Sequence, residues 1–314
     1  MILSNTVISP FFSACIVASV ASISSVHSFA FHKNNNMMNS LATNHRIINH
    51  NHMTTSYMSG TSASSSSSSS TNEIEINESN QPDLPPIDKN HKRLFLVRHG
   101  EVIPPGGTHG VFYGALDVPL SPLGELEAQA AALYLKQFNL EYVACSPLKR
   151  AIFGAKETLK LQQDIKDQDL QSLLSVYDGF SELDRGDWCG KTKTEIGADL
   201  MARFDNCDES VTPKNGESLI YLKSRVMDAQ KQLLQKMTPG KASAIVSHLQ
   251  VTRSMLSDAL GMDIKKMTSE LTVKTASITC IDYDGETNEA IKVHFQSFKP
   301  DAGLETAKDG GNAV

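Results

Sequence analysis

The residues best suited to chemistry follow an apolar run near the first third of the chain. Leu94 to Val97 are consecutive apolar residues, and Arg98, His99 and Gly100 come directly after them. A guanidinium binds phosphate or carboxylate through paired hydrogen bonds, and an imidazole can form a covalent intermediate. We expect a strand buried on both faces, ending in an anion-binding, nucleophilic site where Gly100 lets the backbone approach a ligand. The alternative interpretation is a strand end with a hydrogen-bonded histidine and a surface arginine.

Three further groups with suitable chemistry follow along the chain. Arg150 stands near the start of a predicted helix, whose N-terminus favours anions. Glu182 is one of three nearby carboxylates, with Asp184 and Asp187. A second buried strand ends in His248. Taken alone, Arg150 is better explained as a solvated helix residue. The functional interpretation of Arg150 therefore depends on its position relative to the other motifs.

The order of the motifs resembles a known family. The tetrad 98–101 resembles the nucleophile motif of the histidine phosphatase superfamily, which includes the cofactor-dependent phosphoglycerate mutases. Five later stretches resemble other motifs of the family in the same order: 113–121, 146–151, 180–190, 215–218 and 244–248. The resemblance covers roughly residues 93–298. Phe180 replaces a leucine of the family, and Leu249 and Gln250 replace two glycines, which puts the shape of the pocket in question.

The resemblance implies a role for each of these residues. His99 is expected to attack phosphorus, and Glu182 to protonate the leaving oxygen and then activate water. The expected catalytic residues are His99, Glu182, Arg98, Arg150 and His248, and the expected substrate-binding residues are Arg98, Tyr113, Gly114, Arg150 and His248. No cofactor and no metal site is expected, because two arginines can neutralise a phosphate. The loops 102–113 and 183–214 are expected to form the acceptor pocket.

One segment separates two kinds of activity within the family. Mutases of the family carry a long insert with a Trp-Arg-Arg segment after the catalytic acid, and an Asn six residues after the nucleophile. Here only residues 183–214 lie between Glu182 and the "G-E-S" motif, with Arg185 and Arg203 as their arginines, and Pro105 stands at the Asn position. We therefore expect a phosphatase that hydrolyses a small phosphorylated metabolite through a phosphohistidine. A mutase, or a non-catalytic protein that binds a phosphoryl ligand, are the alternatives.

Alternating strand and helix patterns over residues 93–260 predict the fold class. They favour a three-layer α/β/α sandwich with a mostly parallel sheet, as in phosphoglycerate mutase-like proteins. His99 and His248 are expected to lie within about 10 Å of each other, because both must contact one phosphate. Helices are expected at 122–138, 194–204, 218–237 and 250–260. Strands are expected at 141–146, 173–176, 244–248, 276–282 and 291–295. In the first helix, Leu123, Leu126, Ala130 and Leu133 are expected to be core residues.

Composition divides the chain into four parts. Residues 1–28 resemble a signal peptide, and residues 29–90 a transit peptide followed by a serine-rich disordered linker. The catalytic domain is expected at 91–298 and a disordered tail at 299–314. The junction of Ser28 with Phe29 resembles the bipartite plastid presequences of algae with secondary plastids. A disordered tail on a cytoplasmic or mitochondrial protein is the alternative.

Charge and cysteine content indicate which partners and which cross-links to expect. Only Lys33 and Arg46 of the 29 basic residues, and none of the 35 acidic ones, precede residue 73, so the remainder carries a net charge near −8. An acidic domain argues against nucleic-acid binding, and no stable membrane association is expected after processing. The widely spaced cysteines Cys145, Cys189, Cys207 and Cys280 are expected to be free thiols.

Overall fold

The computed structural model of the chain describes residues 74–162 and 174–304. All described residues belong to one compact unit. The predicted leader and residues 29–73 of the predicted linker therefore lie outside the described residues. So do Leu173, at the start of a predicted strand, and residues 305–314 of the predicted tail.

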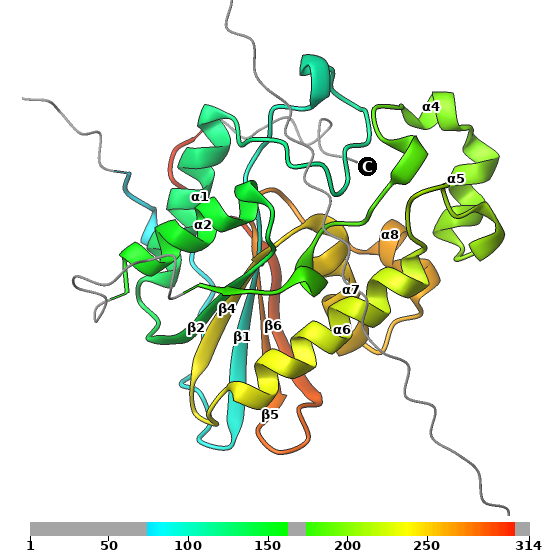
Figure 1. The fold of residues 1–314 in the computed structure, drawn as a ribbon. Coiled ribbons are helices and arrows are strands. Elements are labelled where there is room, and N and C mark those ends of the chain that lie inside the picture. The colour runs from blue at the N-terminus through cyan, green and yellow to red at the C-terminus, as the bar shows by residue number, and fades with distance from the viewer. Residues whose placement is uncertain (1–73, 163–173, 305–314) are drawn as a thin grey trace, which may run out of the picture. The chain divides into compact units, whose positions relative to one another are not determined.

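Among the described residues, a six-stranded sheet forms the centre of the fold (Figure 1). Its strands are β1 (His91–Arg98), β2 (Leu140–Cys145), β3 (Ser175–Val176), β4 (Ala242–Ser247), β5 (Ile278–Asp284) and β6 (Ala290–Phe298). They lie in the order β3-β2-β4-β1-β5-β6. The pairings from β3 to β1 are parallel, whereas β5 pairs antiparallel with both β1 and β6. This arrangement confirms the prediction of a mostly parallel sheet.

Helices cover both faces of the sheet and complete three layers (Figure 1). On one face lie α1 (Pro122–Leu135) and α2 (Lys149–Lys160), and on the other α6 (Leu219–Lys236) and α7 (Leu249–Ala259). In β1, Leu94 and Leu96 join the core under α6 and α7, while Phe95 and Val97 join the core under α1 and α2. Successive side chains of a strand point to opposite faces, so covering both faces requires the continuous apolar run.

Three short helices complete the described fold: α4 (Lys193–Ile196), α5 (Ala198–Asp205) and α8 (Met267–Glu270). The sequence predicted a single helix over 194–204. Two form instead, because Gly197 between them adopts a φ of 103° that no helix contains. The helices α6 and α7 begin and end within one residue of their predicted bounds, and α1 ends three residues early.

The buried face of α1 differs from the prediction. Leu126 is 38% exposed, and Leu123 and Leu133 are only partly buried. Ala130 is buried as predicted. The other buried residues of α1 lie mostly one position along from the predicted leucines, and they are Gly124, Glu127, Ala128, Ala131, Ala132, Tyr134 and Leu135. Glycine and alanine thus supply most of the buried face. Small residues suit this face because α1 packs closely on α2, where a Cβ added at Gly154 would lie 3.8 Å from that of Ala128.

The folded unit extends beyond the predicted domain bounds at both ends. Ile76, Leu84 and Ile87 pack against the core under α1 and α2, although residues up to 90 were predicted to be a disordered linker. The amide of Asn77 donates to the carbonyl of Asp301 over 2.7 Å. The two ends of the domain therefore contact each other, which fixes part of both predicted disordered segments.

Residues 74–162 and 174–304 contain no helix that is both long and apolar enough to cross a membrane. The same residues contain no group of three or more His, Cys, Asp or Glu side chains placed to hold a metal ion. The cysteines in these ranges are Cys145, Cys189, Cys207 and Cys280. All four are free thiols, as predicted.

Candidate active site

The two histidines meet at one edge of the sheet. β1 and β4 are parallel neighbours in which Arg98 pairs with Ser247, so the next residue of each strand is a histidine. The ring centroids of His99 and His248 are 5.1 Å apart, and the rings meet edge to face. Both side chains are buried. The strand register thus brings residues 149 positions apart into contact at the carboxyl ends of parallel strands, where ligand sites of α/β sheets lie.

His99 is held in one tautomer. Its Nδ1 lies 2.7 Å from the carbonyl oxygen of Gly100. A carbonyl only accepts hydrogen bonds, so Nδ1 carries the proton and Nε2 carries the lone pair. Burial, together with the charges of Arg150 and Arg98, holds the pKa of His99 well below its ordinary value. At neutral pH the ring is therefore uncharged.

His248 forms its hydrogen bond through the other ring nitrogen, Nε2. Its Nε2 lies 2.7 Å from Oγ of Ser146, and that oxygen accepts a hydrogen bond from the amide of Leu148. The Ser146 hydroxyl can donate to an unprotonated Nε2 or accept its proton, so Nε2 is hydrogen-bonded in either neutral tautomer. Nδ1 is buried and has no hydrogen-bond partner among the described residues. Burial, Arg150 and His99 lower the pKa of His248 well below its ordinary value.

Arg150 is buried and anchored by a loop. Its terminal nitrogens donate to the carbonyls of Leu116 at 2.6 Å and Gly114 at 2.7 Å. Its Nε is buried without a hydrogen-bond partner among the described residues. The guanidinium lies 5.4 Å from the ring centroid of Tyr113. The solvated-helix interpretation of Arg150 is thereby excluded, since one edge of the guanidinium is fixed by carbonyls and Nε remains a donor.

Gly114 and Tyr113, which we expected to contact substrate, support Arg150 in this structure. Gly114 has a φ of 44°, and a Cβ there would lie 2.3 Å from the carbonyl oxygen of Leu183. Only glycine fits this approach. Gly100 has a comparable constraint, because its Cβ would lie 2.2 Å from the carbonyl oxygen of Gly124 in α1. Gly100 is therefore required for packing against α1, and the approach of its backbone to a ligand stays a prediction.

Arg98 and Glu182 complete the cluster of predicted residues. Arg98 is buried and donates from Nη1 to the carbonyl of Val273 at 2.5 Å. The Glu182 carboxylate is buried and accepts from the amide of Leu183 at 2.7 Å and the amide of Gln250 at 3.3 Å. Gln250 directly follows the helix start after His248, so this contact ties Glu182 to the histidine pair. The site joins a neutral imidazole, two guanidinium groups and a carboxylate.

Burial separates Glu182 from the neighbouring carboxylates. Asp184 and Asp187 are exposed. The carboxylate of Asp184 accepts from the amide of Gly186, and that of Asp187 from the side chain of Asn215. The Asp184 contact is local, and the Asp187 contact reaches the segment before α6. Of the three carboxylates, only Glu182 is buried and bonded to the segment that follows His248.

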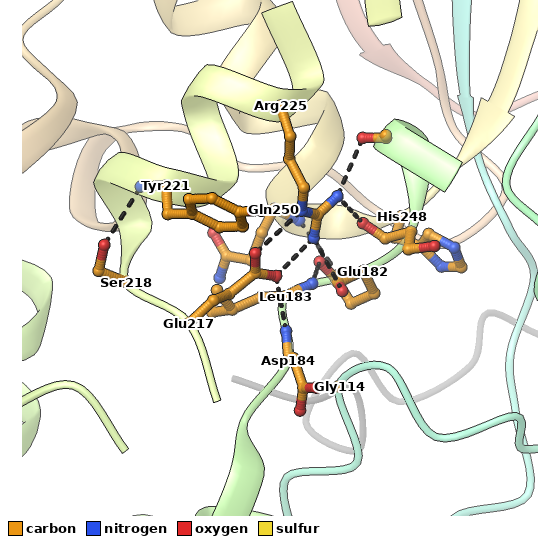
Figure 2. Close-up of polar contacts among 12 residues, drawn as sticks. Gly114, Glu182, Leu183, Asp184, Glu217, Ser218, Tyr221, Arg225, His248 and Gln250 are labelled. Carbon is orange, nitrogen blue, oxygen red and sulfur yellow. Dashed lines mark hydrogen bonds and ion pairs between the residues drawn. The ribbon is translucent and has the colours of Figure 1, made fainter. Parts of the chain in front are cut away.

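Sequence reasoning missed the pair that holds Glu182. Arg225 of α6 donates from Nε to Oε2 of Glu217 at 2.9 Å and from Nη2 to Oε1 at 2.5 Å. Its nitrogens also donate to the carbonyls of Gly179, Ser181 and Glu182. Figure 2 shows the guanidinium between the Glu217 carboxylate and the backbone at Glu182. Arg225 follows Glu217 by eight residues, and the two side chains together form a clamp on the backbone of residues 179–182.

Two segments cover the site at the carboxyl edge of the sheet. Val111 forms a β-bridge with Thr192, and the amide of Gly190 donates to the carbonyl of Phe112 at 2.7 Å. A cleft of about 230 Å³ opens beside them. Its lining includes Arg98 and Gln250, and residues of α5, α7 and the stretch 268–274. The acceptor pocket was predicted from loops 102–113 and 183–214, and the cleft draws on the second of these but not on the first.

This arrangement agrees with the comparison of the chain with known families. A model of the histidine phosphatase superfamily (branch 1) matches residues 94–295. The chain belongs to this superfamily. Its relatives include an uncharacterised phosphatase, PhoE, of Bacillus subtilis, which is 29% identical over 178 residues, or 57% of this chain and 82% of the relative. A 2,3-bisphosphoglycerate-dependent phosphoglycerate mutase of Chlamydia muridarum is 24% identical over 200 residues, or 56% of this chain and 85% of the mutase.

A solved structure within the superfamily shares the fold. A mycobacterial glucosyl-3-phosphoglycerate phosphatase aligns with a TM-score of 0.55 and 23% identity, over 66% of this chain and 99% of that one. At this identity the likeness concerns the fold alone. Phosphatases and mutases thus both stand among the relatives of this chain, and the choice between them depends on its own residues.

Proposed function

We propose that this chain is a phosphomonoesterase that hydrolyses a small phosphorylated metabolite through a phosphohistidine on His99. The observation that carries the proposal is the hydrogen bond from Nδ1 of His99 to the carbonyl of Gly100. It leaves Nε2 as a lone-pair nucleophile beside the donors of Arg98, Arg150 and His248. These groups bring positive charge and ring N–H donors to one place, which suits a dianionic phosphate.

The reaction then proceeds in two balanced steps. Nε2 of His99 attacks phosphorus, the ester P–O bond breaks, and the leaving oxygen takes the proton of Glu182. Water next attacks the phosphohistidine, Glu182 takes its proton, the P–N bond breaks, and inorganic phosphate leaves. The transferring phosphoryl group is loose and charged, so positioning and the two guanidinium groups supply most of the acceleration. Proton transfer by Glu182 adds about 10²–10⁴-fold.

Water is the proposed acceptor because the chain lacks the long insert with a Trp-Arg-Arg segment that mutases of the family carry. The segment 183–214 is short and folds into α4, α5 and tight turns. Arg185 in it is buried over the rings of Phe112 and Phe204, and Arg203 is exposed and paired with Asp208. Neither belongs to an Arg-Arg pair. This favours hydrolysis over transfer between two ends of a sugar acid.

Turnover of 4-nitrophenyl phosphate tests the proposal. Wild-type protein should release one phosphate per nitrophenol, and His99→Ala should release none above background. His91→Ala is the matched control, because His91 lies at the opposite end of β1. Retention of full turnover in His99→Ala would refute the mechanism. Phosphate appearing on an added phosphoglycerate, and not in solution, would instead favour a mutase.

The residues before the domain carry a separate proposal. The acid-free composition of residues 1–72 and the Ser28–Phe29 junction favour import into a plastid through a bipartite presequence. A fluorescent reporter fused behind residues 1–72 should enter plastids, and the same reporter behind residues 29–72 should not. Cytosolic or mitochondrial fluorescence of the first fusion would contradict this targeting.

A further inference from the structure

The cleft beside Arg98 has a strongly basic lining. Its cations are Arg98, Arg185, Lys193, Arg253 and Lys274. Asp205 is the single carboxylate among the described residues that line it. A volume of about 230 Å³ suits a small molecule better than a peptide. The excess of positive charge favours a ligand that carries negative charge of its own.

Gln250 connects this cleft to the proposed reaction. Its amide donates to Oε2 of Glu182, and its side chain lines the cleft. Arg98, which precedes His99, lies on the border of the same cleft. Gln250 thus connects the cleft to Glu182, the proposed donor to the leaving oxygen. The alcohol portion of the substrate would therefore extend into the cleft.

Arg253 is a partly buried cation of this cleft that forms no ion pair with any described residue. It lies on α7 and is partly buried, and its Nε is fixed by the carbonyl of Leu271 at 2.9 Å. Within residues 74–162 and 174–304 it forms no ion pair, and neither do Lys193 and Lys274, which are exposed. Burial and the charge of Arg98 lower the pKa of Arg253 to about 10, so it remains charged at neutral pH.

Asp205 does not neutralise this group. It lies near Arg185, Lys193 and Arg253, each of which lowers its pKa, but burial outweighs them and raises that pKa overall. One carboxylate is therefore shared among three cations. The cleft retains a net positive charge even with Asp205 ionised.

Gln250 adds a neutral hydrogen-bonding atom. The side chain is 3% exposed, and its Oε1 accepts no hydrogen bond from any described residue. An unpaired buried acceptor is unfavourable, and a hydroxyl of a ligand in the cleft would satisfy it. Gln250 stands where the family resemblance leads one to expect a glycine, so this acceptor distinguishes the chain.

We propose that the cleft is a second anion subsite and that the substrate is a small phosphate ester whose alcohol portion carries its own anionic group and a hydroxyl. Arg253, Lys193 and Lys274 bind the second anion, and Oε1 of Gln250 accepts from the hydroxyl. The proposal rests on the proposed function, because it places the leaving alcohol by Glu182. A carboxylate and a second phosphate both have the required chemistry.

Two matched pairs of substrates test the subsite. 3-Phosphoglycerate and glycerol 3-phosphate differ by a carboxylate in place of a hydroxymethyl group. Fructose 1,6-bisphosphate and fructose 6-phosphate differ by a second phosphate. Wild-type protein should show a kcat/KM at least tenfold higher for the acidic member of one pair, and the pair concerned identifies the second anion.

Variants then assign that preference to residues. Arg253→Gln should lower the ratio of kcat/KM between the two members about tenfold, as expected for one lost charge-assisted hydrogen bond. Lys274→Ala, at an exposed position that does not endanger folding, should lower it in the same direction. Arg203→Gln is the matched control, since it removes an exposed arginine of α5 that does not line the cleft.

The outcomes separate this inference from the proposed function. Hydrolysis of 4-nitrophenyl phosphate by wild-type protein and its loss in His99→Ala support the function whatever the subsite does. Equal kcat/KM within both pairs, or an unchanged ratio in both Arg253→Gln and Lys274→Ala, would overturn the subsite. If no compound is hydrolysed, calorimetric titration of each compound into the wild-type protein measures whether the acidic member of a pair binds more tightly. Equal affinity for both members of each pair would overturn it there too.

Discussion

Arg225 offers the sharpest test of how the fold positions the proposed acid. The side chains of Arg225 and Glu217 are only 18% and 10% exposed, and Arg225 also donates to three carbonyls of residues 179–182. In Arg225→Met, Glu217 loses its partner and the carbonyls lose a donor. Breaking a buried pair from one side costs about 3–5 kcal/mol. Partial exposure of this pair places the expected loss near the lower bound, about 3 kcal/mol.

The Arg225→Met substitution should lower both the urea midpoint and kcat. A loss of about 3 kcal/mol lowers the urea midpoint by roughly 1–1.5 M for a slope of about 2–3 kcal/mol per M. A displacement of Glu182 by about 1 Å should cost roughly 100-fold in kcat for an alkyl phosphate. The cost should be much smaller for 4-nitrophenyl phosphate, whose leaving oxygen needs little protonation.

A double-mutant cycle with Glu217→Gln gives the control. Because the two side chains act together, the double variant should be less destabilised than the sum of the single variants by at least about 1 kcal/mol. Two results would refute the reasoning. One is a urea midpoint in Arg225→Met equal to that of wild-type protein. The other is equal slowing of alkyl and nitrophenyl phosphates, which would show that Arg225 does not act through Glu182.

Two further predictions concern the histidines and Gly114. Burial depresses the folded-state pKa of His99 and His248 below 6.5, so below that pH the unfolded chain binds more protons. Stability should therefore fall as pH drops through about 6.5, by up to roughly 1.4 kcal/mol per unit for each histidine. Urea midpoints at about pH 7.5 and 5.5 measure this, and an unchanged midpoint would contradict it. Gly114→Ala should lose about 2–3 kcal/mol and most activity, because its Cβ would lie 2.3 Å from the Leu183 carbonyl. Gly110→Ala, also at positive φ but with open space around it, should retain activity in the same assays.

The positions of the histidines at the ends of predicted strands explain why much of the site could be predicted from the sequence. His99 and His248 each follow a continuous apolar run, and parallel neighbouring strands must end at the same edge. That rule alone places the two rings close together. It also predicts the position of Arg98, and family order supplied Arg150 and Glu182.

Other features depend on packing that no local pattern encodes. The clamp of Glu217, which precedes α6, and Arg225, which lies on α6, acts on carbonyls more than 35 residues upstream. The spacing of the two residues in the sequence does not indicate this contact. The buried face of α1 follows alanines because α2 lies close by, whereas hydrophobicity alone favoured the leucines. The basic cleft gathers cations from α4, α7 and the stretch before β5, which only the tertiary fold brings together.

The central claim is that phosphate passes through His99. The direct measurement is rapid quench of wild-type protein with substrate labelled in its phosphate, followed by recovery of protein-bound label after alkaline or acid treatment. Phosphohistidine survives base and is lost in acid. We predict a burst of base-stable, acid-labile label in wild-type protein and none in His99→Ala. Label that survives acid, or label that persists in His99→Ala, would show that another residue is the nucleophile.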